Sequence, residues 1–149
     1  MPHRLERSRG LTLTSEVQIM LFKLLTRLPA TDLDRARLWY AEKLGLDPAE
    51  EREGGLRYIV GGCEFALFTS HGVSDGSFTQ MGFEVSDLAA TVAELKRRGV
   101  VFEEYHEGPL RTENGIAKIE GNYASKGVGE YAAWLRDSEG NMIGLGQPF

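Results

Sequence analysis

Two stretches of the chain repeat one pattern, and this internal duplication constrains the fold more than any single residue does. Residues 25–45 (LTRLPATDLDRARLWYAEKLG) and 80–99 (QMGFEVSDLAATVAELKRRG) each contain an alternating run, an Asp-Leu pair and a helix-period segment that ends at a glycine. A repeated strand–helix unit indicates two equivalent modules. Because equivalent strands place equivalent side chains, the repeat also indicates where a shared site lies.

The first copy of the repeat extends into further strands. Residues 23–28 alternate as a strand with two different faces, and Thr31-Asp32 precede apolar residues at helical spacing. The runs LRYIV and CEFALF then flank Gly61-Gly62, which predicts a hairpin.

The second copy predicts the same order of elements. Residues 80–85 alternate, Ser86-Asp87 precede a helical stripe, and residues 100–105 are expected to form the next strand. Residues 106–129 predict a long loop with a strand near Ile116, and residues 137–140 predict a hairpin turn. We therefore expect an α+β fold with helices on one face of curved antiparallel sheets.

Composition excludes several classes of protein. The 149 residues are 42% hydrophobic and 26% charged, which is ordinary for a folded chain. The formal net charge of -5 disfavours nonspecific nucleic-acid binding, which needs a basic face.

We expect a flexible arm at residues 1–20 and a single domain at 21–149, with modules at about 21–71 and 79–149 joined by a linker at 72–78.

The cysteine count and the hydropathy pattern bear on the compartment. Cys63 is the only cysteine, so no disulfide forms within the chain, and we expect it to pack as a small hydrophobic residue. No apolar run approaches the roughly 20 residues that span a bilayer, and the first residues lack the apolar core of a signal peptide. These features predict a cytoplasmic protein without membrane partners.

Three segments resemble the vicinal oxygen chelate superfamily, which includes glyoxalase I, extradiol dioxygenases, fosfomycin-modifying enzymes and bleomycin-resistance proteins. The segments are PATDLDRARLWYAEKLGL, FTQMGFEVSDLAATVAELKRRGV and AAWLRDSEGNMIGL, and the resemblance covers about residues 21–148. It implies two βαβββ modules whose sheets curl around a cavity, usually completed by a homodimer.

The resemblance also implies where a metal ion would be held. Metal-dependent members place a ligand, typically His, Gln or Glu, on four strands, and the matching positions here are Leu25, Ala66, Gln80 and Gly144. Three of these side chains offer no lone pair, and Gln80 alone cannot hold a divalent ion. The expected cavity therefore contains no metal ion and no other cofactor.

Strand parity predicts further side chains in the cavity, where aromatic walls and a few charges are typical of a small-molecule pocket. The alternative is that the charged members pair with one another or reach solvent at the end of a sheet. The additional ligand-binding candidates are Arg27, Glu64, Phe68, Glu84, Tyr131 and Trp134.

Three residues are candidates for acid–base chemistry, namely Glu64, Glu84 and His106. A carboxyl base needs a raised pKa in a dry pocket. His106 begins the long loop, where a solvated histidine is the more frequent outcome.

Three functional hypotheses remain open at the level of sequence. The first is a metal-independent dimeric protein that binds a small organic molecule, such as a drug that it sequesters. The second is a metal-free isomerase or lyase that uses a carboxylate or histidine base. The third is a metal-dependent lyase or dioxygenase, which requires a different register on several strands.

Overall fold

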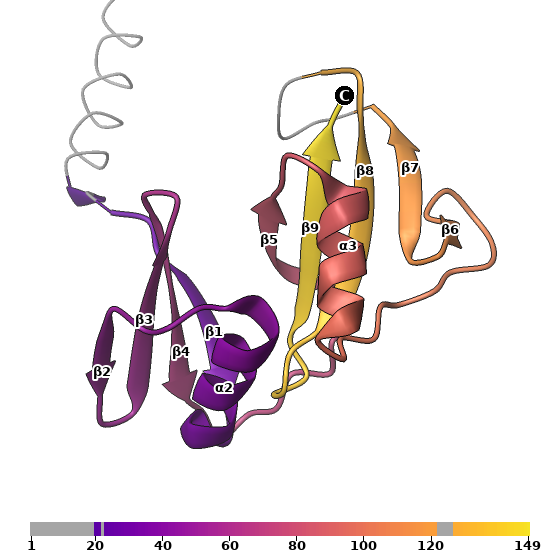
Figure 1. Cartoon of the computed structure of the whole chain (residues 1–149). Coiled ribbons are helices and arrows are strands. Elements are labelled where there is room, and N and C mark those ends of the chain that lie inside the picture. The colour runs from indigo at the N-terminus through magenta and orange to yellow at the C-terminus, as the bar shows by residue number, and fades with distance from the viewer. Residues whose placement is uncertain (1–19, 22, 122–126) are drawn as a thin grey trace, which may run out of the picture.

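The computed structural model describes residues 20–21, 23–121 and 127–149, and it contains two modules that lie side by side (Figure 1). The first comprises β1 (Thr26–Ala30), α2 (Leu33–Trp39), the π-helical turn η1 (Tyr40–Leu44), β2 (Glu50–Arg52), β3 (Gly55–Val60) and β4 (Cys63–Thr69). The second comprises β5 (Thr79–Glu84), α3 (Leu88–Arg97), β6 (Thr112–Glu113), β7 (Ile116–Glu120), β8 (Gly129–Arg136) and β9 (Met142–Pro148). The predicted α+β class is confirmed.

The two modules pair their strands in the same way. The sheet orders are β1-β4-β3-β2 and β5-β9-β8-β7-β6. In each sheet the first strand runs parallel to the last strand of its module, and the remaining neighbours are antiparallel. The strand that opens each copy of the repeat therefore lies at a sheet edge.

Both helices begin at the aspartate of the Asp-Leu pair. The Asp32 carboxylate accepts a hydrogen bond from the Arg35 N–H, and the Asp87 carboxylate accepts one from the Ala90 N–H, both at 3.0 Å. These bonds satisfy backbone N–H groups that the first helical turn leaves unpaired. The helical segment of the first module ends at Gly45, whose φ of 68° is left-handed and suits glycine.

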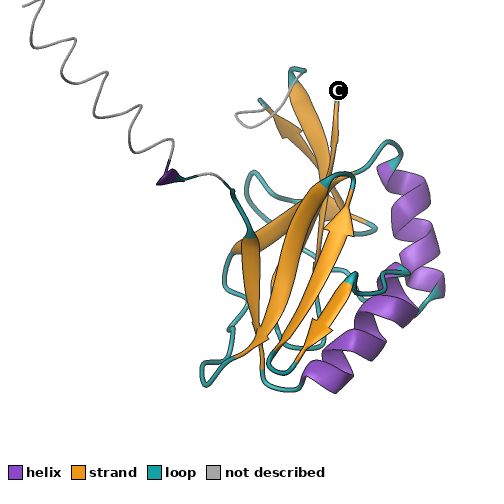
Figure 2. Ribbon diagram, turned by 90° about the vertical axis from the view of Figure 1, so that its left-hand side faces the viewer, coloured by secondary structure: helices purple, strands orange, loops and turns teal. Residues whose placement is uncertain are grey.

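One hydrophobic core joins the modules. Tyr40 of η1 and Leu88 of α3 are both fully buried members of this cluster. Between the sheets, the Phe65 ring of β4 meets the Phe83 ring of β5 edge to face, with 6.0 Å between the centroids. Figure 2 shows both helices along the same side of the strands. The helix-covered faces of the two sheets therefore meet in the common core.

A polar junction holds the turn before β9 against the start of α2. The Glu139 carboxylate accepts hydrogen bonds from the N–H groups of Thr31 and Asp32, each at 3.0 Å. The Arg35 guanidinium donates to both of its oxygens. Burial alone would raise the pKa of Glu139, but these hydrogen bonds and charges outweigh burial and hold the pKa at about 2.

The same junction continues under the turn. The Tyr40 hydroxyl donates to the buried Asp137 carboxylate at 2.7 Å, and the Asn141 amide donates to both Asp137 and the Pro29 carbonyl. Burial, with the charge of Asp137 next in importance, raises the pKa of Tyr40 well above its ordinary value. These contacts fix the orientation of one module relative to the other.

Several local expectations are wrong. Residues 100–105 form no strand beyond an isolated bridge between Phe102 and Leu135, and Phe102 packs in the core. The short strands β2 and β6 lie outside the residue ranges that the local patterns assigned to strands, although the βαβββ resemblance allows a third strand after each helix. Cys63 is exposed rather than packed, since it follows the Gly61-Gly62 turn at the start of β4. The predicted arm at residues 1–20 lies outside the described residues, except for Met20.

Candidate functional site

Each sheet has one face covered by helices and one face that is free of them. On the first sheet, Leu28, Phe65 and Leu67 point into the core, so the alternating residues Arg27 and Ala66 lie on the other face. We call this surface the first helix-free face. Its members are Arg27, Arg57, Ile59, Glu64, Ala66 and Phe68, with Leu25 just before β1.

Charged side chains cross the first helix-free face in a continuous row. The Glu64 carboxylate pairs with Lys23 at 2.8 Å and with Arg57 at 3.1 Å, and Arg57 also pairs with Glu50 at 3.1 Å. The hydrogen bond from Lys23, followed by the charges of Lys23 and Arg57, lowers the pKa of Glu64. An acid–base role for Glu64 needs the opposite shift, so this environment disfavours it.

Beside this row, an arginine lies on an aromatic ring. The Arg27 guanidinium carbon is 4.6 Å from the Phe68 ring centroid, an arrangement in which the cation is attracted to the ring face. Ala66 pairs with Arg27 in the neighbouring strand, and Leu25 is 37% exposed. The structure thus places five predicted lining residues of this module on one face: Leu25, Arg27, Glu64, Ala66 and Phe68.

The second sheet has a floor of small residues on its helix-free face. Strand pairing sets Gly82 and Trp134 on either side of Gly144, and sets Ala132 beside Gly146. A Cβ atom at Gly144 would lie 3.8 Å from the Trp134 indole. Because Gly144 has no side chain, β9 places none against the indole at this position. We call the surface formed by these residues the second helix-free face.

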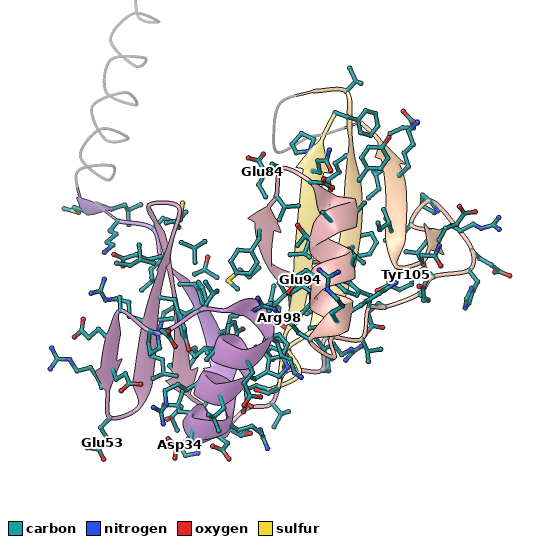
Figure 3. The ribbon with its side chains drawn as sticks, viewed as in Figure 1. Asp34, Glu53, Glu84, Glu94, Arg98 and Tyr105 are labelled. Atoms are coloured by element: carbon teal, nitrogen blue, oxygen red, sulfur yellow. The ribbon has the colours of Figure 1, made fainter. Side chains whose placement is uncertain are left out.

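Tyr105 and Glu130 border this floor. The Tyr105 ring stands edge-on to Trp134 with 5.5 Å between centroids, and a Cβ at Gly146 would lie 3.2 Å from the Glu130 carboxylate. Figure 3 shows Tyr105 and Glu84 at opposite corners of the second sheet. Neither Tyr105 nor Glu130 was predicted from the sequence.

Gln80 does not keep the alternation expected of β5. The pairing of β5 with β9 shifts register between Thr79 and Met81, and a Cβ at Gly144 would lie 3.2 Å from the Thr79 methyl group. The Gln80 amide instead donates to the Asn141 side chain and accepts from the Ser74 hydroxyl and the Met142 N–H. Thr79 therefore occupies the place beside the glycine floor where the sequence predicts Gln80.

Three further candidates lie away from the Trp134 floor. Tyr131 lies an odd number of residues from Trp134, so it faces the core side of β8, where its ring packs on Phe149 at 4.9 Å. Glu84 lines a separate depression with Gln147 at the β5–β9 edge. His106 is exposed in the segment after Phe102. The structure brings none of the three next to Trp134.

The two helix-free faces diverge within one chain. Their opposite faces meet at Phe65 and Phe83 in the common core, so the helix-free faces point outward. A cavity bounded by both kinds of face therefore needs a second copy of the chain. Among the described residues, no group of three His, Cys, Asp or Glu side chains is placed to hold a metal ion. Within the same ranges, no helix combines the length and apolar character needed to cross a bilayer.

The fold and these faces define a class, the proteins built from paired βαβββ modules with open sheets. The chain belongs to the Glyoxalase/Bleomycin resistance protein/Dioxygenase superfamily, whose family model matches residues 22–145. None of the curated proteins compared with it matches the chain.

Solved structures with the same fold include several proteins of this kind. A glyoxalase/bleomycin resistance protein/dioxygenase from Alicyclobacillus acidocaldarius has 19% identity and a TM-score of 0.61, covering 85% of this chain and 90% of its own. The bleomycin resistance determinant encoded on transposon Tn5 has 22% identity and a TM-score of 0.59, covering 85% and 97%. TnmS3, an antibiotic-binding protein from Streptomyces sp. CB03234, has 25% identity and a TM-score of 0.55, covering 84% and 93%.

Proposed function

We propose that this protein binds a small organic molecule without a metal ion, in cavities that a homodimer forms between a first and a second helix-free face. Drug or antibiotic sequestration in the cytoplasm is the role that we propose for this binding. The observation that carries the proposal is the small-residue floor of Gly82, Gly144 and Gly146 beside the half-buried Trp134. A flat ring can lie on such a floor and contact the indole.

The four positions that correspond to metal ligands in metal-dependent relatives also favour this proposal. Leu25, Ala66 and Gly144 offer no side-chain donor, and the Gln80 amide is already engaged by Ser74, Asn141 and Met142. Two neighbours with this fold are described as a bleomycin resistance determinant and as an antibiotic-binding protein, which makes antibiotics the first ligands to test.

The divergence of the two helix-free faces supports the proposed homodimer. Residues on the first helix-free face include the exposed Ile59 and Leu25, and an exposed apolar surface of this kind is stabilised by burial against another chain. In the proposed dimer, Arg27 and Phe68 of one copy form the wall opposite Trp134 of the other. Light scattering coupled to size exclusion measures the mass directly, and a monomer at micromolar concentration contradicts this part of the proposal.

Fluorescence tests ligand binding, because the chain contains two tryptophans, Trp39 on α2 and Trp134 on β8. In Trp39→Phe only Trp134 emits, and we expect a bound aromatic antibiotic such as bleomycin to quench it saturably. In Trp134→Phe only Trp39 emits, and we expect no quenching at the same concentrations. Equal quenching of both variants contradicts the assignment of the site.

The same samples separate binding from catalysis. Mass spectrometry of the recovered ligand is expected to show an unchanged molecule. A converted product would instead support the metal-free isomerase or lyase, with Glu84 or His106 as the base to substitute next. Elemental analysis of the purified protein tests the third hypothesis, since stoichiometric zinc, nickel, manganese or iron contradicts metal independence.

A further inference from the structure

Two polar groups on the second helix-free face have no partner within the described residues, and each lies over one glycine of β9. The Glu130 carboxylate makes no ion pair and no hydrogen bond there, and a Cβ at Gly146 would lie 3.2 Å from its Oε2 atom. The indole N–H of Trp134 has no acceptor in the same ranges, and a Cβ at Gly144 would lie 3.8 Å from its Nε1 atom. The two groups therefore border one glycine floor.

Strand geometry sets the spacing of these groups. Glu130 and Trp134 are four positions apart on β8, an even difference that places both on the side away from the core. Gly144 and Gly146 are two positions apart on β9, with Leu145 between them pointing into the core. Two residues of a strand span about 7 Å, so a carboxylate and an N–H donor lie about one aromatic ring apart along the floor.

Both groups remain accessible to a ligand. Glu130 and Trp134 are half-buried. In the described part of the chain, the Tyr58 hydroxyl is the one fully buried side-chain oxygen or nitrogen without a hydrogen bond. The Trp134 N–H, which also lacks a hydrogen bond, therefore keeps contact with solvent, and a ligand acceptor can reach it.

Backbone hydrogen bonds hold the aromatic end of the floor in place. The Thr112 hydroxyl accepts from the Tyr105 N–H, and the Thr112 N–H donates to the Tyr105 carbonyl, both at 2.8 Å. The Glu103 N–H donates to the Trp134 carbonyl at 2.8 Å. The Tyr105 ring is thereby fixed edge-on to the indole, and an ordered wall of this kind lowers the cost of binding a ligand.

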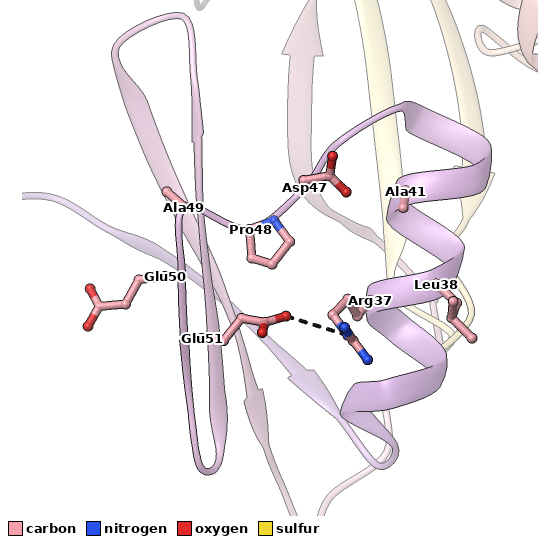
Figure 4. Close-up of a pocket in the computed structure, with 8 residues that line it drawn as sticks. All are labelled: Arg37, Leu38, Ala41, Asp47, Pro48, Ala49, Glu50 and Glu51. Atoms are coloured by element: carbon pink, nitrogen blue, oxygen red, sulfur yellow. Dashed lines mark ion pairs between the residues drawn. The ribbon is translucent and has the colours of Figure 1, made fainter.

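Carboxylates beside another hollow are matched by arginines. Between α2 and β2, the Glu51 carboxylate lies 3.5 Å from the Arg37 guanidinium (Figure 4). The Glu50 carboxylate of the same hollow lies 3.1 Å from Arg57. Glu130 differs from both, because no described cation pairs with it. A half-buried carboxylate in this state favours a ligand that brings its own positive charge.

We propose that the second helix-free face selects a flat ring compound with an ammonium group at one end and a hydrogen-bond acceptor at the other. This inference rests on the proposed binding function and names the class of ligand. The ammonium pairs with Glu130 over Gly146, and the ring lies on the floor. The acceptor receives the Trp134 N–H over Gly144.

4-Acetylbenzylammonium is a suitable probe, because its benzene ring holds an ammonium and a carbonyl oxygen at opposite ends. The full chain with Trp39→Phe has a single indole N–H signal, that of Trp134. In proton–nitrogen spectra, we expect the probe to shift this signal and the Gly146 amide signal saturably. A dissociation constant on the order of millimolar is expected for a ligand of this size.

Two analogues each remove one of the recognised groups. 4-Acetylbenzyl alcohol has no charge and is expected to bind about tenfold more weakly, because it loses the charge-assisted hydrogen bond to Glu130. 4-Ethylbenzylammonium has no carbonyl. It is expected to shift the Gly146 amide signal while leaving the Trp134 indole signal nearly in place.

One variant and one matched control locate the carboxylate. Glu130→Gln is expected to weaken 4-acetylbenzylammonium about tenfold and to leave the affinity for 4-acetylbenzyl alcohol unchanged. Glu120→Gln removes an exposed carboxylate from the neighbouring strand β7, where the residue paired with Glu130 is Ile119. Glu120 therefore projects from the opposite side of the sheet, and its variant is expected to bind as the parent does.

Several results would overturn the proposal. These are unchanged affinity for the probe in Glu130→Gln, equal binding of the alcohol, the absence of saturable shifts, or shifts confined to signals other than Gly146 and Trp134. If antibiotics still quench Trp134, such a result leaves the proposed function intact. Charge-dependent binding of the probe without quenching by antibiotics would instead contradict the sequestration role alone.

Discussion

The two helix-free faces come from equivalent strands of duplicated modules, yet they differ in what fills them. On the first, Glu64 lies between Lys23 and Arg57, so its charge is matched by the protein itself. On the second, the strand neighbour of Trp134 is Gly144, which places no side chain against the indole. The two modules thus share one backbone arrangement, but charged side chains line the first helix-free face and glycines line the second. We infer that the second face selects the ligand and that the first closes over it.

Loss of Glu139 is expected to have the largest effect, because its carboxylate joins the modules that carry the two faces. Glu139→Gln removes the ion pair with Arg35 and weakens acceptance from the Thr31 and Asp32 N–H groups. We expect a loss of about 2–3 kcal/mol in the free energy of unfolding, measured by urea denaturation. Glu53→Gln is the matched control, since that side chain is exposed.

The pH dependence of this difference follows from the depressed pKa of Glu139. A carboxyl held at about 2 in the folded state stabilises the fold at pH above its ordinary value near 4.5. This contribution is lost as the pH falls from about 4.5 toward 2. The parent and Glu139→Gln should therefore converge in stability across that window, whereas a constant difference contradicts the role given to this carboxylate.

Filling the glycine floor is expected to have the next largest effect, and it acts on one face alone. In Gly144→Val the new side chain meets Thr79 and approaches Trp134, so the space for a ligand ring is lost. Ligand affinity, followed by Trp134 quenching in the Trp39→Phe background, is expected to fall roughly 10- to 100-fold, as overfilling costs about 1–3 kcal/mol.

A matched control for this substitution exists on the first sheet. Gly55 pairs with Phe68, and a Cβ there would lie 3.7 Å from the Leu67 carbonyl, an ordinary contact. Gly55→Val is therefore expected to bind nearly as the parent does. Equal losses of affinity in the two valine variants contradict the assignment of ligand selection to the second face.

The sequence predicted the fold well because its signals are local and occur twice. Asp32 and Asp87 each cap a helix, and the Gly61-Gly62 turn joins two alternating strands, so each element is determined by neighbouring residues. The placement of Arg27 and Ala66 on one face followed from the positions that the family resemblance indicated, together with the alternation of the strands. Such local patterns predict an element well when no distant contact competes with them.

The errors arose where a side chain's position depends on distant contacts. The register shift after Thr79 turns Gln80 away from the glycines of the second helix-free face. No local sequence pattern predicts this shift. Tyr105 packs on Trp134 because its segment does not continue as a strand of the sheet. The alternating pattern of residues 100–105 had instead predicted a strand there. The placement of Tyr131 could have been found, because it is three positions before Trp134 and an odd difference in position changes the face of the strand.

Removal of the Glu64 charge from the first helix-free face is expected to have a smaller effect. Glu64→Gln retains the shape of the side chain and removes the charge that Lys23 and Arg57 share. Because the lowered pKa of Glu64 keeps it ionised, we expect no change in a pH–activity profile if any turnover is found. We also expect the ligand affinity to remain within about threefold of the parent, since solvent screens the partly exposed partners Lys23 and Arg57. Loss of turnover in this variant would instead make Glu64 the base of a metal-free enzyme.

The smallest effect is expected at Arg27, which lies on an aromatic ring and has no carboxylate partner within the described part of the chain. Arg27→Gln removes the cation from the Phe68 ring, and a contact of this kind at an exposed site contributes about 0.5–1 kcal/mol. The melting temperature measured by thermal unfolding should therefore change only slightly. If two copies meet as proposed, ligand affinity falls further than stability does, because the same guanidinium then borders the ligand of the partner copy. Equal, small changes in both measurements would show that Arg27 only covers Phe68, and the contrast between the two faces would then rest on the glycine floor alone.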